Sequence, residues 1–166
     1  MTTPIPVADK FINAGVTTIY FIPTIEDVQA PTRAELDAGT DLTDEVTATS
    51  GWQVSSANVT YNPLGTTFTP SIPGRTTVED SSLTLPQDMN GEDVREVLPR
   101  GTTGFVVIMH GGDVEDGPMD VWPVRVSSLG KSISTEGTEV ASIVVSFAIP
   151  AEPAESIAIP GTSPSP

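Results

Sequence analysis

The stretch Glu139-Val-Ala-Ser-Ile-Val-Val-Ser-Phe-Ala-Ile149 has the clearest alternation in this chain of 166 residues. Its apolar residues recur at every second position: Ala141, Ile143, Val145, Phe147 and Ile149. Ser142 and Ser146 lie between them. A period of two puts alternate side chains on opposite faces of a β-strand. We therefore expect a strand here with one buried face.

Further strand patterns lie before this stretch. Thr103–His110 has apolar residues on both faces, with Phe105, Val107 and Met109 opposite Val106 and Ile108. Neither face suits water, so we expect one face in the subunit core and part of this sheet covered by a neighbouring copy. Other expected strands span Val16–Ile22, Thr43–Thr49, Gly51–Tyr61, Val78–Leu85 and Met119–Ser127.

Two short helices interrupt the strands. In Pro31–Gly39, Thr32 and Glu35 have the spacing of a capping box, and Gly39 can end the helix. The second helix is expected at Gly91–Leu98, with Asn90 as its N-cap and a narrow apolar stripe.

The order of elements predicts a mainly β fold. Strands, a short helix and more strands favour an antiparallel β-sandwich or barrel with the helix packed on its side. Residues 1–15 form an extended N-terminal arm, 16–149 the domain, and 150–166 a Pro/Ser-rich C-terminal tail that is flexible or docks elsewhere.

Residues 62–77 are expected to form a long loop. Pro63, Pro70 and Pro73, together with two glycines, leave little scope for a long central strand. The loop nevertheless carries apolar residues that a solvated segment does not need: Leu64, Phe68 and Ile72. We expect this segment to be mobile in the free protein and docked in an assembly.

The composition is strongly acidic, with 22 Asp and Glu against 7 Lys and Arg and a net charge of −15. Such a surface does not hold nucleic acid by its phosphates, nor does it dock on anionic lipid. Two interpretations stay open. The charge keeps the protein soluble, or it lines a surface that DNA passes without sticking.

The sequence offers no catalytic constellation. There is no cysteine, one histidine (His110), two lysines, and neither a phosphate loop nor a Gly-x-Ser-x-Gly elbow. We expect His110 to be structural or exposed, no enzyme activity and no cofactor. No secretory leader and no apolar run long enough to span a membrane is visible, which predicts synthesis in the cytoplasm.

Two acidic groups are candidates for a charged functional surface. The first is the loop with Asp113, Glu115, Asp116 and Asp120, and the second is the group Asp41, Asp44 and Glu45. The loop lacks EF-hand spacing, so a solvated hairpin loop is favoured over a calcium site.

The segment Pro31-Thr-Arg-Ala-Glu-Leu-Asp-Ala-Gly-Thr-Asp-Leu-Thr43 resembles one found in major tail proteins of long-tailed, non-contractile phages that infect actinobacteria. The remainder is similar in order only: an acidic short helix, a Gly-rich turn and a Pro/Ser/Thr-rich end. The motif carries no chemistry, so it identifies no catalytic residue.

The resemblance implies a β-sandwich subunit that forms hexameric rings. These rings would stack into a hollow tail tube in the virion, through which the genome leaves. Its partners would be further copies of the chain, a tape measure protein and other tail proteins, with DNA passing but not bound. Either the loop with Asp113, Glu115, Asp116 and Asp120 or the group Asp41, Asp44 and Glu45 would then contribute to the lumen surface. Leu64, Phe68 and Ile72 would form a candidate ring-stacking contact.

Two other functions remain open. An acidic β-sandwich with a Pro-rich tail also fits an immunoglobulin-like binding module for adhesion or decoration, although aromatic residues are only 5% of the chain. A capsid-decorating or tail-terminator protein differs mainly in whether rings stack. Electron microscopy separates ring formers from binding modules.

Overall fold

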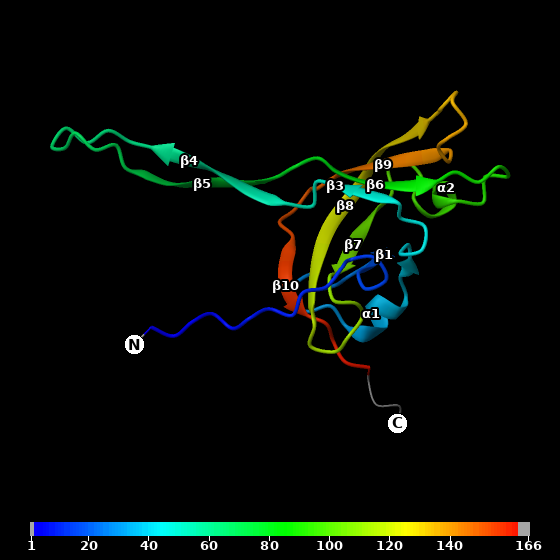
Figure 1. Ribbon diagram of the computed structural model, residues 1–166, viewed down its shortest axis with the longest axis horizontal. Coiled ribbons are helices and arrows are strands. Elements are labelled where there is room, and N and C mark those ends of the chain that lie inside the picture. Colours follow the sequence, from blue (N-terminus) through cyan, green and yellow to red (C-terminus); the bar gives the residue numbers. More distant parts are fainter. Residues whose placement is uncertain (1, 163–166) are drawn as a thin grey trace. The chain divides into compact units, whose positions relative to one another are not determined.

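A computed structural model describes residues 2–162 and shows a mainly β protein with antiparallel strands and two short helices (Figure 1). The chain divides into two compact units. Unit 1 comprises residues up to 44, 104–122 and those from 153 on, and unit 2 comprises 45–103 and 123–152. Among the described residues, no helix is long and apolar enough to cross a lipid bilayer.

Unit 1 is built on β1 (Thr18–Ile22), which pairs antiparallel with both β2 (Thr40–Asp41) and β7 (Thr103–Met109). Its remaining strands are the first part of β8 (Pro118–Ser132) and β10 (Ala154–Ala158), which pair antiparallel with each other. The core cluster of this unit is Ile22, Ile25, Leu36, Val107, Met109, Met119, Val121, Ala154 and Ile159.

Strand β7 has both faces buried, as its double apolar pattern predicts. Val106 and Val107, on opposite faces, are each 0% exposed, and Ile108 and Met109 are also buried. The chain itself already removes these side chains from water, so the double apolar pattern of β7 does not require a neighbouring copy. That a neighbour continues or covers part of this sheet stays a prediction.

The larger sheet of unit 2 contains antiparallel strands in the order β8, β9 (Ser142–Ala148), β6 (Ser81–Pro86) and β3 (Ala48–Ser50). The alternation predicted for β9 is confirmed in Ile143, Val145 and Phe147, which are buried. We expected a strand over residues 43–49, but residues 43–47 are not part of β3. Only the Thr47 N–H continues the pairing, because it donates to the carbonyl oxygen of Thr84.

Helix α1 (Arg33–Asp37) has the predicted capping box. Thr32 Oγ1 accepts the Glu35 N–H at 3.3 Å, and Glu35 Oε2 accepts the Thr32 N–H at 2.6 Å. Leu36 carries the helix into the core of unit 1. A single turn is stable here because the cap satisfies its free N–H groups and the core holds its apolar side.

Helix α2 (Val94–Val97) is shorter than expected, and its N-cap is Asp93, not Asn90. The Asp93 carboxylate accepts the Arg95 N–H and pairs with the Arg95 guanidinium, which lowers the pKa of Asp93 to about 2. Gly91 has a φ of +87°, outside the helical region, so the helix cannot start as early as residue 91.

Residues 71–77 are strand and not loop, which corrects the expectation for 62–77. β5 (Ser71–Val78) pairs with β4 (Val54–Thr60) as a separate two-stranded antiparallel sheet, which Figure 1 shows as a long ribbon. Pro73 is tolerated because the ribbon has only two strands and its register shifts between Ser56 and Asn58, so few ladder bonds are lost.

Of the two expectations for the C-terminal segment, flexible or docking, the structure shows docking for the residues up to 162. Ala154–Ala158 form β10 on β8, and Ile159 is completely buried. Alternation failed to reveal this strand because Ser156 has a φ of +55° and the register shifts between Ala154 and Ile157. Residues 163–166 of the predicted tail lie outside the described residues.

Candidate assembly surfaces

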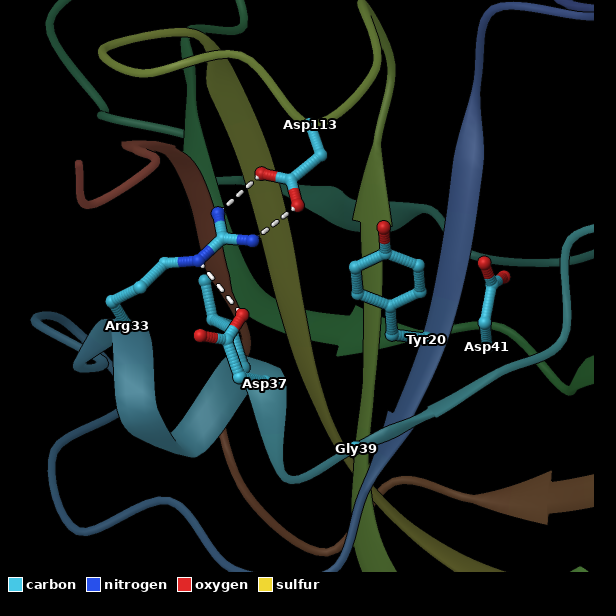
Figure 2. Close-up of a pocket in the computed structure, with 7 residues that line it drawn as sticks. Tyr20, Arg33, Asp37, Gly39, Asp41 and Asp113 are labelled. Atoms are coloured by element: carbon cyan, nitrogen blue, oxygen red, sulfur yellow. Dashed lines mark hydrogen bonds and ion pairs between the residues drawn. The ribbon is translucent and has the colours of Figure 1, made fainter. Parts of the chain in front are cut away.

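The acidic loop after β7 is tied to helix α1 by an ion pair (Figure 2). Arg33 Nη1 and Nη2 donate to Asp113 Oδ1 and Oδ2 at 2.6 and 2.7 Å, and Arg33 Nε donates to Asp37 Oδ1 at 2.8 Å. The side chains of Arg33 and Asp113 are only 20% and 19% exposed. A fork of two parallel charge-assisted bonds is a strong and geometrically specific contact.

The pKa directions agree with this geometry. The hydrogen bonds from Arg33 hold the pKa of Asp113 below its ordinary value, and the same bonds raise the pKa of Arg33. Burial raises the pKa of the Tyr20 phenol, and the carboxylates of Asp113 and Asp41 raise it further. At neutral pH the ion pair is therefore charged and the phenol is neutral.

A polar pocket of about 190 Å³ lies beside this ion pair, lined by Tyr20, Arg33, Leu36, Asp37, Gly39, Asp41 and Asp113 (Figure 2). It brings Asp41 and Asp113, from the two predicted acidic groups, to one place. Throughout residues 2–162, no group of three or more His, Asp or Glu residues is arranged to hold a metal ion.

Asp120 is engaged within the chain. Its Oδ2 lies 2.7 Å from His110 Nε2, and its Oδ1 accepts the Ser156 N–H at 2.7 Å. The carboxylate thus supports the irregular part of β10. The His110 side chain is 47% exposed and its ring lies within hydrogen-bond distance of this carboxylate, which fits the expectation that His110 is structural or exposed.

The remaining candidate carboxylates are exposed. Glu115 and Asp116 lie at the tip of the acidic loop, and neither makes an ion pair among residues 2–162. Asp44 and Glu45 are likewise exposed. The structure therefore separates the seven candidates into two that are compensated by a partner side chain, Asp113 and Asp120, and five that are not.

The three candidate stacking residues lie on the ribbon and its connecting loop, all in solvent. Leu64 and Phe68 are in the loop between β4 and β5, Ile72 is in β5, and their exposed fractions are 106%, 72% and 54%. Val59 and Tyr61 are also exposed on this hairpin. We define the exposed hairpin surface as these five residues. Sequence analysis missed Val59 and Tyr61, although both alternate with polar neighbours.

The N-terminal arm is a second exposed apolar segment. Residues 2–12 form neither helix nor strand, and Ile5, Val7, Phe11 and Ile12 are all exposed. Sequence analysis predicted an arm but no contact residues in it, although these four apolar side chains within eight positions were a visible signal.

Exposed apolar side chains on the β4–β5 ribbon and on the arm are typical of surfaces that contact other proteins. The chain matches the model of the phage tail tube protein family over residues 6–162, and it belongs to that family. It is therefore a structural protein of a virion tail and not an enzyme.

Solved structures share its fold at low identity. A chain of the sheath/tube terminator of an extracellular contractile injection system, PVC, in the extended state is 10% identical with a TM-score of 0.61, covering 89% of this chain and 98% of that one. A chain of the sheath-tube complex of PVC is 13% identical with a TM-score of 0.55, covering 93% of each.

A third similar structure is a chain of the virion of a native gene transfer agent particle. It is 14% identical with a TM-score of 0.54, covering 88% of this chain and 99% of that one. At such identities the likeness establishes the fold alone. No curated protein matches this chain in sequence.

Proposed function

We propose that this chain assembles into hexameric rings that stack into the tail tube of a long-tailed, non-contractile phage infecting actinobacteria. Such a tube is the conduit for genome ejection. Membership of the tail tube family supports the tube, and the resemblance of residues 31–43 supports the phage type. The subunits are made in the host cytoplasm and join a tape measure protein and other tail proteins in the virion.

The exposed hairpin surface carries the proposal. A two-stranded ribbon has no core of its own, and its apolar side chains remain in water in the single subunit. Burying them against a neighbouring ring would contribute roughly 25 cal/mol per Å² of apolar surface removed from water. The rival interpretation as an immunoglobulin-like binding module has no comparable support from the family match.

The acidic composition fits a conduit for DNA. A basic wall would bind phosphates, and a moving duplex would have to break each contact. Five of the candidate lumen residues are exposed and have no basic side-chain partner within residues 2–162: Asp41, Asp44, Glu45, Glu115 and Asp116. These five would contribute most of the negative electrostatic potential at the proposed inner wall. Asp113 contributes less because it is paired with Arg33.

Electron microscopy of concentrated purified protein tests assembly. We expect rings with sixfold symmetry and tubes made from them, whereas isolated particles at every concentration would contradict the proposal. A map of the tube tests the conduit separately. An inner wall that is neutral or basic, with the carboxylates outside, would overturn the lumen assignment and leave the family membership intact.

Limited proteolysis tests the role of the hairpin. The free subunit should be cut within the loop at residues 61–70, which carries no strand pairing beyond the Tyr61–Pro70 backbone bond. Assembled protein should resist cleavage there. Equal cleavage rates in both states would show that the loop is not an inter-subunit contact.

A further inference from the structure

Two arginines line one small pocket in unit 2. The pocket has a volume of about 230 Å³ and is lined by Arg100, Gly101, Arg125, Val126, Ser127 and Ala148. Arg125 lies on β8 opposite Ala148 of β9, and Gly101 N donates to Val126 O at 2.9 Å. The strand pairing and this hydrogen bond thus bring Arg100 and Arg125 to the same pocket.

These arginines lack a carboxylate partner, although carboxylates outnumber Lys and Arg by 22 to 7 in the chain. Arg33 and Arg95 are each paired with aspartates, but neither Arg100 nor Arg125 makes an ion pair within residues 2–162. Arg100 Nε donates to Ser127 O at 3.1 Å, which fixes the side chain beside the pocket. No bond within the described residues uses its terminal nitrogens.

We propose that this pocket is an inter-subunit contact that receives a carboxylate from the acidic surface of a second copy of the chain. Charge complementarity selects this partner: a subunit of net charge −15 presents many unpaired carboxylates. Arginine binds carboxylate through two parallel bonds, and the adjoining Val126 and Ala148 help to exclude water. The inference rests on the proposed self-assembly. It adds the location of one attractive contact, which would offset the electrostatic repulsion between acidic subunits.

A phosphate group has the same complementarity to arginine, but a nucleic acid is disfavoured. Duplex DNA approaching this pocket must approach a subunit of net charge −15, and two arginines release few counterions. A second subunit is also acidic, but its exposed hairpin and arm side chains offer apolar surface that association can bury. The second copy is therefore the occupant to test.

The test compares charge reversals inside and outside the pocket, with Arg125→Glu and Lys131→Glu as the pair matched in charge. The variant Arg125→Glu and the double variant Arg100→Glu/Arg125→Glu change the pocket, whereas Lys131→Glu changes another exposed basic residue of β8, outside the pocket. Assembly is followed by sedimentation velocity and electron microscopy at low and high salt. We expect Arg125→Glu to weaken assembly by about tenfold or more and the double variant to weaken it further. Lys131→Glu should stay within about twofold of wild type.

Thermal unfolding of each variant shows whether the fold survives. We expect the variants to fold, because both arginines are exposed in the single chain. Should a glutamate variant misfold, Arg100→Gln/Arg125→Gln removes the charge without reversing it and should still weaken assembly. Arg125→Lys should give an intermediate result, because it keeps the charge and loses the fork.

The outcomes separate this inference from the proposed function. Wild-type protein that stays monomeric would contradict self-assembly itself. If wild-type protein assembles and the pocket variants match Lys131→Glu, only the inter-subunit pocket is wrong. Binding of a duplex DNA probe by wild-type protein that the double variant loses would also overturn it, in favour of a phosphate site.

Discussion

The acidic loop at residues 113–120 and the β4–β5 hairpin differ in whether their side chains find partners within the chain. In the loop, Asp113 and Asp120 are bonded to Arg33 and His110 of the same chain. In the hairpin, Leu64, Phe68 and Ile72 contact water. Two carboxylates of the loop thus have partners within the chain, whereas these apolar side chains of the hairpin stay in water. Substitutions in the first should change stability, and substitutions in the second should change assembly.

The largest expected effect is on assembly and comes from the hairpin. Leu64→Asp/Phe68→Asp should abolish rings and tubes, because charged side chains cannot be buried against a neighbouring subunit without partners. The matched control is Thr67→Asp/Thr69→Asp, which adds the same charge at exposed polar positions of this loop. Electron microscopy and thermal unfolding are the two measurements. Loss of assembly by the control as well would mean that charge alone is responsible.

The next effect is on folding and comes from β7. A Cβ added at Gly104 would lie 2.6 Å from Cζ of Phe21 and 2.8 Å from the carbonyl oxygen of Ile22. Gly104→Ala should therefore lower the free energy of unfolding by about 1–3 kcal/mol. Gly65→Ala is the control, since nothing lies within 4 Å of its added Cβ. Chemical denaturation measures both, and equal stability of the two variants would contradict the close packing.

A smaller effect is expected from the ion pair of the acidic loop. Asp113→Asn removes one charge from the Arg33 fork and should cost about 1–2 kcal/mol at neutral pH, with assembly unchanged in the folded fraction. Glu115→Gln, an exposed neighbour without an ion pair, serves as the control and should cost nothing measurable.

The pH dependence of that difference follows from the lowered pKa of Asp113. A carboxyl group whose pKa is lower in the folded state stabilises the protein above its unfolded pKa of about 3.9. The stabilisation is lost as pH falls through the folded pKa. Melting temperatures of wild type and Asp113→Asn should therefore differ at about pH 6 to 7 and converge as the pH falls through the lowered pKa of Asp113. A constant difference across this range would refute the ion-pair contribution.

The smallest effect is expected at His110. Its ring is half exposed and bonded to Asp120, so His110→Ala should change the free energy of unfolding by no more than about 0.5 kcal/mol. Assembly should remain at the wild-type level. A large loss of assembly without a loss of stability would give this histidine a role that the structure does not indicate.

The sequence by itself determined those elements whose pattern or hydrogen bonds involve only residues close together in the chain. The period of two in residues 139–149 predicted β9, and the spacing of Thr32 and Glu35 predicted the cap of α1. The acidic composition and the lack of catalytic residues pointed to a structural protein, and the family match confirms that class. Each of these inferences depends only on neighbouring residues or on sums over the chain.

Tertiary structure decided what depends on residues far apart. Arg33 and Asp113 are 80 positions apart, so no local pattern joins them. Residues 71–77 contain Pro73 and Gly74, which disfavour a strand, yet pairing with β4 makes them one. Ala154–Ala158 becomes a strand only because β8 offers a free edge. In each case the backbone and charged groups are satisfied by distant partners, and a sequence read in order does not show which partner the fold will supply.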